Sequence, residues 1–314
     1  MSPSVDVVVP TFNGWELTRG CLERLREQTI PHVLIVSDNA STDGTADKVC
    51  SMFPEVRVVG LERNRGFAVA CNRGVAAGES DVVVLLNNDV ECPADFLERL
   101  VRPLEDDRVA MVAGVLVRPG VDEIDGVGLT ADVTLTGFSR LDGRPVREAG
   151  LESPVVTGPS GGAAAYRRTA WEAAGGLDEQ IFIYSEDLDL AFRIRAAGWD
   201  AAVASDAVAV HLGSVTMGIR SARQRYQSGF SRAYLLRRYS VLRGRVGVRA
   251  LVTEVTVVVG DALISRDLSA LRGRFAGWKA ARNLPRLPKP PLEAIEKGIG
   301  FWESLRLRRR AYAR

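Results

Sequence analysis

Four short apolar runs alternate with amphipathic stretches over the first part of the chain, and this pattern constrains the fold more than any other feature. The runs cover residues 5–9, 33–36, 56–61 and 82–86, and the stretches between them cover residues 16–28, 45–50 and 68–76. Leu17, Cys21 and Leu25, for example, recur at the four-residue spacing that places side chains on one helix face. Such alternation predicts an α/β fold with a doubly wound, mostly parallel, Rossmann-like sheet and helices on both faces.

Polar side chains follow three of the four predicted strands, and a carboxylate among them is a candidate metal ligand. These side chains belong to Thr11, Asn13, Asp38, Asn39, Asn88 and Asp89. Because ligands of open α/β sheets bind beyond the carboxyl ends of the strands, we expect these side chains to line one cleft. Asp89 would suit a hard divalent cation, and a cation there would suit a phosphate. Taken alone, however, Asn87-Asn88-Asp89 is better explained as a turn after a strand.

Motifs of several other protein classes are absent from the sequence. No G-x-G-x-x-G follows the first strand, which argues against a dinucleotide-binding domain, and no G-x-x-x-x-G-K-[ST] indicates a P-loop nucleotidase. The four cysteines are scattered without a CxxC pair, which argues against a zinc site or a disulfide framework and is typical of a reducing cytoplasm. The first predicted strand begins almost at once, so we expect no signal peptide. The apolar stretch 251–264 contains Glu254 and Asp261 and is too short and too charged to span a bilayer.

The middle of the chain breaks the alternation of strands and helices. Residues 111–117 predict a further strand, and residues 122–146 predict hairpins or an irregular excursion. Residues 157–166 are small and Gly-rich, which would let another group approach the backbone closely, although a flexible or tightly packed turn explains the glycines better. Residues 169–175 predict a short helix that stops at two glycines.

Two later stretches hold further candidate site residues. Glu186, Asp187 and Asp189 open a predicted helix that extends to residue 197. The helix dipole favours acidic residues in a first turn, and a general base can also be held ionised there. These acids could therefore stabilise the helix or act in catalysis. His211 follows the predicted strand 207–210, and a lone histidine is usually structural. Near Asp89 it would instead complete a site for Mn²⁺ or Mg²⁺ rather than Zn²⁺.

Charge is distributed unevenly, although the net charge is only +2. Residues 220–314 contain 22 of the 41 Lys and Arg residues but 6 of the 39 Asp and Glu residues. Tyr226, Phe230 and Tyr234 recur there at four-residue spacing, which is typical of a basic amphipathic helix on an anionic membrane surface. A solvated charged face, a composition bias and a homodimer contact are the alternatives, and no nucleic-acid-binding motif accompanies the charge. We therefore expect an α/β domain over residues 1–218 and a basic, mainly helical C-terminal extension over residues 219–314.

Six motifs, in one order, resemble those of the family 2 inverting glycosyltransferases, which have a GT-A type nucleotide-diphosphosugar transferase fold. The matching segments are Val8-Val9-Pro10-Thr11-Phe12-Asn13, Val36-Ser37-Asp38-Asn39-Ala40-Ser41-Thr42-Asp43-Gly44, Asn64-Arg65-Gly66-Phe67 with Asn72-Arg73-Gly74, Leu86-Asn87-Asn88-Asp89, Gly175-Gly176-Leu177-Asp178-Glu179 and Ser185-Glu186-Asp187-Leu188-Asp189-Leu190 with Arg193. Any one motif is weak, whereas six in register are specific. The resemblance is closest to bacterial rhamnosyltransferase-like members that build cell-surface polysaccharides, and it does not cover the C-terminal third.

The resemblance implies roles for the matching residues. The nucleotide-sugar donor would be bound by Pro10, Thr11, Phe12, Asn13, Asp38, Asn39, Arg65, Asn72, Asn87 and Asn88. Asp38 would hydrogen-bond the base, and Arg65 and Asn72 would lie near the base or the diphosphate. Many relatives have an acid where Asn87 or Asn88 stands, so fewer negative charges would surround the cation here.

Catalytic, metal-binding and acceptor-side roles are carried over in the same way. Asp89 would be the metal-binding carboxylate of the family's D-x-D element, and His211 a second ligand of Mg²⁺ or Mn²⁺. Asp187 would be the general base, with Glu186 as its neighbour. The acceptor side would include Gly161, Gly162 and Asp189.

The implied reaction moves a sugar, such as rhamnose, from a dTDP- or UDP-sugar to a hydroxyl of a glycan, a lipid-linked or a small-molecule acceptor. One base and one cation suffice, and the sugar configuration inverts because no carboxylate nucleophile is required. A sugar-phosphate nucleotidyltransferase would need a Gly-rich basic loop that residues 10–14 lack, and a non-catalytic nucleotide-sugar-binding protein would have lost the Asp187 base. We expect a cytoplasmic enzyme, peripheral on the inner face of the cell membrane.

Overall fold

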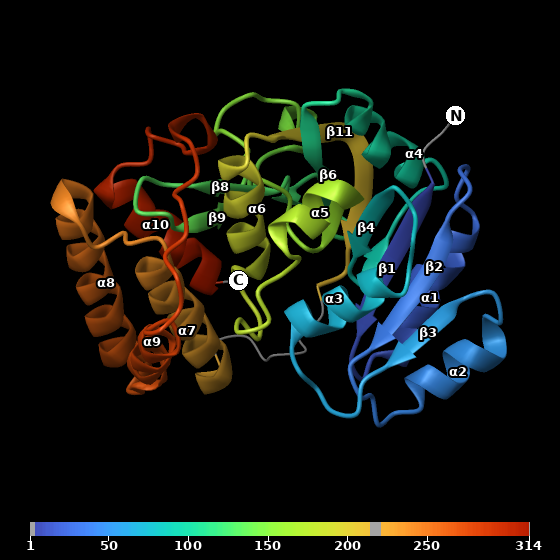
Figure 1. The fold of residues 1–314 in the computed structure, drawn as a ribbon, viewed down its shortest axis with the longest axis horizontal. Helices are drawn as coiled ribbons and strands as arrows, with labels where there is room; N and C mark the ends of the chain where they lie inside the picture. Colours follow the sequence, from blue (N-terminus) through green and yellow to red (C-terminus); the bar gives the residue numbers. More distant parts are fainter. Residues whose placement is uncertain (1–3, 214–220, 314) are drawn as a thin grey trace.

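A nine-stranded sheet forms the centre of the computed structural model, which describes residues 4–213 and 221–313 (Figure 1). The strand order is β3-β2-β1-β4-β10-β6-β11-β5, with β7 paired to β6. The strands are β1 (Val5–Thr11), β2 (Val33–Asp38), β3 (Arg57–Gly60), β4 (Val82–Leu86), β5 (Val90–Glu91), β6 (Val109–Val117), β7 (Ile124–Gly126), β10 (Ala163–Arg167) and β11 (Asp200–His211). A separate hairpin pairs β8 (Leu129–Ala131) with β9 (Gly137–Ser139).

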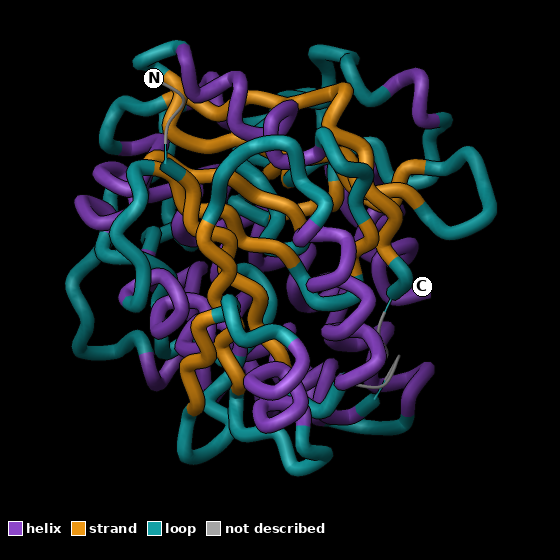
Figure 2. The backbone as a smooth tube through the Cα atoms, turned by 90° about the vertical axis from the view of Figure 1, so that its right-hand side faces the viewer, coloured by secondary structure: helices purple, strands orange, loops and turns teal. Residues whose placement is uncertain are grey.

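Helices cover both faces of the sheet, as the sequence pattern predicts. They are α1 (Trp15–Arg26), α2 (Thr45–Met52), α3 (Phe67–Ala76), α4 (Phe96–Val101), α5 (Arg168–Ala174) and α6 (Glu186–Ala196). Successive side chains of β1 alternate between two apolar clusters, with Val7 in the cluster under α1, α2 and α4 and Val8 in the cluster under α3, α5 and α6. The strands therefore lie in the middle of the molecule with helices around them, as the view turned by 90° shows (Figure 2).

The predicted parallel order holds for the first four strands, and the second half of the sheet is mixed. Strands β3, β2, β1 and β4 are parallel neighbours, whereas β10 runs antiparallel to both β4 and β6. Residues 157–166 were expected to form a turn, but Ala163 and the residues after it form this central strand. Alanine has little intrinsic preference for strands, so the sequence signal is weak. Small side chains fit here because the strand is buried on both faces, with Ala163 and Ala165 in one cluster and Ala164 in the other.

Strand β11 is longer than predicted and leads to the candidate site. It begins at Asp200 rather than at residue 207, pairs in parallel with β6, and has an irregularity between Val203 and Val208. Its last residue, His211, pairs with Val90 of the short strand β5, which runs antiparallel to it. Residues 122–146 contain β7 and the β8–β9 hairpin, which agrees with the expected hairpins.

The C-terminal extension is helical, and its helices pack on the rest of the protein. They are α7 (Ala222–Arg238), α8 (Gly244–Ser265), α9 (Ser269–Ala280) and α10 (Phe301–Ala313). Leu188 and Phe192 of α6 share one apolar cluster with Tyr234 and Tyr239 of the extension. The expected domain boundary at residue 218 lies outside the described residues, and among those described no helix is both long enough and apolar enough to span a membrane.

The aromatic stripe predicted for the first helix of the extension faces the protein interior. Tyr234 is fully buried, and its hydroxyl group donates a hydrogen bond to Asp178 (2.6 Å). Phe230 stacks on Tyr234 with ring centroids 6.0 Å apart. Gly229 of α7 lies so close to α9 that an added Cβ would stand 2.3 Å from the carbonyl oxygen of Ala270. Tyr234 and Phe230 of this stripe therefore pack against the protein core and do not face outward.

Candidate active site

The residues after β4 connect it to the neighbouring strands β1 and β10. The Asn87 N–H group donates to the carbonyl oxygen of Gly162 (3.1 Å), and the Asn87 side chain lines a cavity. The Asn88 amide donates to the hydroxyl oxygens of Thr11 (3.2 Å) and Thr18 (3.0 Å). Asn88 therefore links the end of β4 to β1 and α1. An amide suits this position because it donates to both hydroxyl oxygens.

Asp89 and His211 lie together at the end of the sheet, as the sequence analysis expected. Asp89 is 3% exposed, and its Oδ1 is 3.3 Å from His211 Nε2. The chain is held there because the Leu212 N–H group donates to the Asp89 carbonyl oxygen (2.9 Å). On its other side, His211 Nδ1 is 2.7 Å from the Oδ2 atom of Asp125, a residue of β7 that the sequence analysis did not single out. Burial lowers the pKa of His211, but hydrogen bonds to Asp125 and Asp89 raise it to about 10.

These three residues do not form a ready-made cation cage. Among residues 4–213 and 221–313, no group of three or more His, Cys, Asp or Glu side chains is arranged to hold a metal ion. Asp125 also pairs with Arg118 (3.2 Å), so its carboxylate is shared between a guanidinium group and the imidazole ring. This end of the sheet therefore places one carboxylate, Asp89, beside one imidazole ring, His211, with Asp125 behind the ring.

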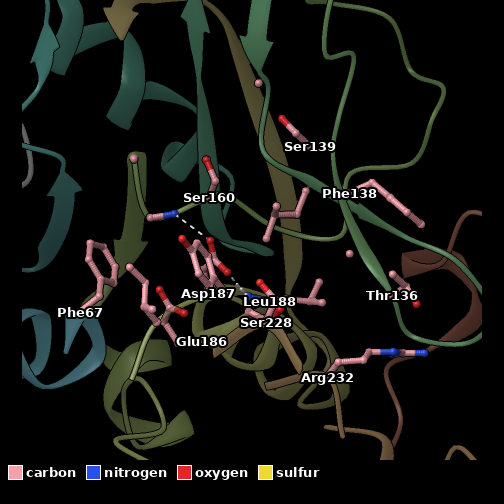
Figure 3. A pocket seen from close by; sticks show the side chains of 18 of the residues that line it. Phe67, Thr136, Phe138, Ser139, Ser160, Glu186, Asp187, Leu188, Ser228 and Arg232 are labelled. Atoms are coloured by element: carbon pink, nitrogen blue, oxygen red, sulfur yellow. Dashed lines mark hydrogen bonds between the residues drawn. The ribbon is translucent and has the colours of Figure 1, made fainter. Parts of the chain in front are cut away.

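A cavity of about 520 Å³ opens beside this pair and reaches the start of α6. Figure 3 shows Asp187 near its centre, with Phe67 and Glu186 on one side and Thr136 and Phe138 of the β8–β9 hairpin on the other. His211 also lines this cavity. Asp187, the predicted base, and His211, one of the two predicted metal ligands, therefore line the same cavity, although they lie 24 positions apart in the chain.

Local backbone geometry holds the Asp187 carboxylate in place. Its Oδ2 accepts a hydrogen bond from the Gly161 N–H group (3.1 Å), and its Oδ1 accepts one from the Leu188 N–H group (2.8 Å). Burial raises the pKa of Asp187, and these two N–H groups oppose the rise. Burial and the charge of Asp187 raise the pKa of Glu186 well above its usual range. A carboxylate with a raised pKa that lines a cavity can accept a proton from a bound hydroxyl group.

The two predicted acceptor-side glycines line the cavity, whereas the third predicted residue does not. A Cβ added at Gly161 would stand 2.8 Å from the Phe67 ring, and one added at Gly162 would stand 2.9 Å from the Leu116 side chain. Asp189 is fully buried in α6, with its carboxylate bound to Arg193 (2.7 Å) and to the Tyr239 hydroxyl group (2.9 Å). This carboxylate therefore joins α6 to the C-terminal extension and is not available to an acceptor.

The predicted nucleotide-binding residues at the ends of β1 and β2, and in the loops that follow these strands, do not line this cavity. Asn13 Oδ1 accepts a hydrogen bond from the Thr42 N–H group (2.7 Å), and Asp38 Oδ2 accepts one from the Ser41 N–H group (3.0 Å). The other oxygen of Asp38, Oδ1, is buried and has no hydrogen-bond partner among the described residues. Pro10 and Phe12 flank Thr11 at the same end of β1, where Pro10 pairs with β2.

The remaining predicted donor residues hold loops together. Asn39 accepts a hydrogen bond from the Arg65 N–H group (2.9 Å), so β2 is joined to the loop before α3. The Arg65 guanidinium group is 3.6 Å from Glu179. Asn72 uses both ends of its amide on the backbone of Leu177, at 2.9 Å and 3.0 Å. Asn72 is therefore part of the contact between α3 and the segment after α5.

A cluster of arginine side chains from the C-terminal extension, none of which was predicted as a site residue, forms part of the cavity wall. Arg232 of α7, Arg274 of α9 and Arg308 of α10 line the cavity and bind the same carboxylate, Glu254 of α8, at 2.8–2.9 Å. Burial favours the neutral form of Glu254, but the three guanidinium groups hold its pKa well below the usual range. The signal available in the sequence was Glu254, one of two acidic residues within an apolar stretch.

Comparison with known proteins identifies the relatives of this chain. The family model described as glycosyl transferase family 2 matches residues 6–174, more than half of the chain. The chain is 24% identical over 313 residues to the O-antigen chain rhamnosyltransferase RfbN of Salmonella typhimurium, which covers 96% of both chains. It is 29% identical over 241 residues to the N-acetylglucosaminyl-diphospho-decaprenol L-rhamnosyltransferase of Mycobacterium tuberculosis, which covers 67% of this chain and 76% of the relative.

Solved structures share the fold at lower sequence identity. The mannosyltransferase PcManGT from Pyrobaculum calidifontis, in complex with GDP-Man and Mn²⁺, has a TM-score of 0.57 at 22% identity, covering 100% of this chain and 86% of that one. GalNAc-T7 with UDP, GalNAc and Mn²⁺ has a TM-score of 0.60 at 15% identity, covering 91% and 59%. These likenesses confirm the predicted GT-A fold. The chain belongs to glycosyltransferase family 2, and it is a rhamnosyltransferase-like enzyme that uses a nucleotide sugar.

Proposed function

We propose that the protein is an inverting, metal-assisted glycosyltransferase in which Asp187 is the general base. The observation that carries this proposal is that Asp187 and His211, the partner of Asp89, line the same cavity. In the proposed reaction Asp187 accepts the proton of an acceptor hydroxyl group as its oxygen attacks the anomeric carbon. The bond from that carbon to the diphosphate breaks on the opposite face, so the configuration inverts without a carboxylate nucleophile.

The donor we propose is a dTDP- or UDP-sugar, with rhamnose as the sugar. The names of the Salmonella and Mycobacterium relatives support rhamnose. The buried, unpartnered oxygen of Asp38 supports a contact with the base, because a ring N–H group would satisfy it. Thr11, Asn13 and Asn87 would stand beside the remaining part of the donor.

A divalent cation, Mg²⁺ or Mn²⁺, suits the ligand types that Asp89 and His211 present. One carboxylate and one imidazole leave coordination positions for diphosphate oxygens, and Mn²⁺ accepts both ligand types. When bound, the cation would offset the negative charge that develops on the leaving diphosphate. The Mn²⁺ in two structures of the same fold supports the choice of a divalent cation.

The proposed acceptor is a hydroxyl group of a glycan or of a lipid-linked saccharide. Gly161 and Gly162 leave the cavity open next to Asp187, and the β8–β9 hairpin bounds it on the other side. The Mycobacterium relative is named for a decaprenol-linked acceptor. A lipid-linked acceptor would hold the reaction at the inner face of the cell membrane, where we propose that the protein acts as a peripheral enzyme.

Two variants test the assignment of base and metal ligand separately. Asp187→Asn is expected to abolish sugar transfer while leaving donor binding nearly unchanged, because the amide cannot accept the proton. Asp89→Ala is expected to weaken the thermal stabilisation that a nucleotide sugar gives in the presence of Mn²⁺ or Mg²⁺. Asp47→Asn, at an exposed position on α2, is the matched control. Equal loss of transfer and donor binding in Asp187→Asn would reject its role, and no stabilisation of the wild type by any nucleotide sugar would reject the proposed function.

A further inference from the structure

Helix α8 has one face on the protein and one apolar face in solvent. Its buried residues include Gly247, Ala250 and Thr253. The opposite face is a stripe at spacings of three or four residues, formed by Val248, Leu251, Val252, Val255, Val259 and Leu263. Exposure ranges from 49% at Val252 to 74% at Leu263. In Figure 1, α8 is the outermost helix at the left edge, far from the sheet.

From Val248 onward, the charged side chains of α8 contact other parts of the protein, whereas Arg245, in the first turn, is exposed and precedes the stripe. Arg249 donates to the Ile299 carbonyl oxygen (2.7 Å) and pairs with Asp132 (3.3 Å). Glu254 is held by the arginine cluster, and Asp261 is 3.9 Å from Arg225. The stripe is therefore apolar over its whole length. A monomeric soluble protein rarely exposes a large continuous apolar surface without using it for an interaction.

The charges around the stripe are basic. Arg243 and Arg245 flank the start of α8 and Arg266 follows its end, and all three are exposed. Among the described residues after residue 220, the exposed charged side chains are basic with the exception of Glu293. The acidic residues Glu254, Asp261 and Asp267 are engaged with arginines inside the extension. The surface thus combines an apolar stripe with an excess of positive charge.

An apolar stripe with basic surroundings could contact a second copy of the chain, a nucleic acid or a lipid bilayer, and the three fit it unequally. A second copy of the chain would cover the stripe but would bring two strongly basic surfaces together, which is unfavourable. A nucleic acid would satisfy the charge but would leave the apolar side chains uncovered. An anionic lipid bilayer satisfies both, because acyl chains accept the apolar side chains and headgroups attract the arginines.

We propose that the outward face of α8 docks the enzyme on an anionic membrane surface. The inward face of the same helix carries Glu254, which holds the arginine cluster that lines the cavity. Docking through α8 would therefore hold the arginine-lined wall about one helix diameter, roughly 10 Å, from the bilayer. A lipid-linked acceptor could present its sugar to Asp187 from there. This last step rests on the proposed function, whereas the docking itself does not.

Vesicle binding tests the proposal on the full-length protein. The wild type is expected to float with vesicles of equimolar phosphatidylglycerol and phosphatidylcholine, and to bind pure phosphatidylcholine more weakly. Leu251→Asp/Val255→Asp should reduce binding to the anionic vesicles by at least about tenfold, because two side chains no longer enter the bilayer. Met52→Asp is the matched control, since Met52 is similarly exposed (49%) but lies on α2. Thermal unfolding at an unchanged temperature shows that the variants fold.

Vesicle binding, the oligomeric state and donor binding together decide the role of this face. Absence of wild-type binding to anionic vesicles, or equal binding of the double variant, would overturn the proposal. A dimer in sedimentation analysis that the double variant dissociates, without vesicle binding, would assign the face to a second copy and also overturn it. Donor binding is measured in parallel by nucleotide-sugar stabilisation. Vesicle binding without donor binding would reject the proposed function alone, and donor binding without vesicle binding would reject the docking surface alone.

Discussion

His211 stands between two carboxylates, and its two contacts differ in length. Nδ1 is 2.7 Å from Asp125, whereas Nε2 is 3.3 Å from Asp89. The shorter contact favours a proton on Nδ1, so Nε2 is the nitrogen that would face a cation in the proposed site. Asp125 would therefore act through His211 as a positioning residue, without touching the cation itself.

We expect Asp125→Asn to weaken Mn²⁺ binding about 10- to 100-fold, because a neutral amide oxygen accepts the Nδ1–H hydrogen bond more weakly than a carboxylate and no longer makes the ring more basic. Electron paramagnetic resonance of free Mn²⁺ during a titration measures the affinity without turnover. Glu123→Gln is the matched control, since Glu123 also pairs with Arg118 (3.1 Å) but does not contact His211. Equal Mn²⁺ affinity in the wild type and Asp125→Asn would exclude this role.

The raised pKa of Glu186 should make the free energy of unfolding depend on pH. Burial and the charge of Asp187 raise its pKa above the ordinary 4.5. The folded state then keeps a proton that the unfolded chain has released, so the wild type loses stability as the pH rises from about 4.5 towards the folded-state pKa. Glu186→Gln cannot ionise and should show a smaller loss over this range. Urea unfolding between pH 5 and 8 measures the two slopes, and parallel slopes would contradict the assignment.

The sequence singles out Asp187, Asp89 and His211 as candidate site residues, and it does not single out Asp125. The first three belong to or follow motifs whose order resembles a known family, and the structure brings His211 and Asp89 into contact. Asp125 lies in a three-residue strand within an irregular segment, and only the pairing of β6 with β7 delivers it to the ring. Asp189 was predicted to lie on the acceptor side from its position in a motif, but α6 buries it against Tyr239.

At the scale of elements, the sequence was informative where hydrophobic periodicity and propensity agree. Strands β1 and β4 are rich in valine; β4 has the predicted bounds, and β1 extends two residues beyond the predicted end, to Thr11. Strand β10 was not predicted because its three alanines carry neither signal, and the sheet dictates its conformation through pairing with β4 and β6. Helix α7 was predicted, but the partner of its aromatic face was not, since periodicity shows which residues share a face and not what covers it.

The contact of one carboxylate with three arginines makes α8 sensitive to the loss of a single charge. Glu254→Gln would leave Arg232, Arg274 and Arg308 without their shared counter-charge. We expect a loss of about 3–5 kcal/mol of folding free energy, the usual cost of breaking a buried pair. Urea unfolding measures the loss, and Glu293→Gln, at an exposed position in the same extension, is the control. A loss below about 1 kcal/mol, as for a surface pair, would show that the cluster does not depend on this charge.

At the scale of the whole molecule, the C-terminal helices complete the core and are not an appended tail. Leu188 of α6 and Leu135 of the β8–β9 loop lie in one apolar cluster with Leu235 and Val241 of the extension. Arg232 donates to the carbonyl oxygens of Thr134 and Leu135 at 3.0 Å and 2.9 Å. The uneven distribution of charge suggested a separate basic segment. Composition shows which charges are present, but it does not show that several of these arginines are buried in contact with the rest of the protein.

Removing the extension therefore tests whether residues 1–218 can fold alone. Without residues 219–314 the cluster would expose Leu188, Phe192 and Leu135, and the cavity would lose its arginine wall. We expect the shortened chain to lose its sharp cooperative thermal transition and to bind a hydrophobic dye, since exposed apolar surface is the mark of lost tertiary packing. Co-expression of residues 219–314 as a separate chain should restore the transition. A cooperative transition of residues 1–218 at the wild-type temperature would instead show that the two parts fold independently.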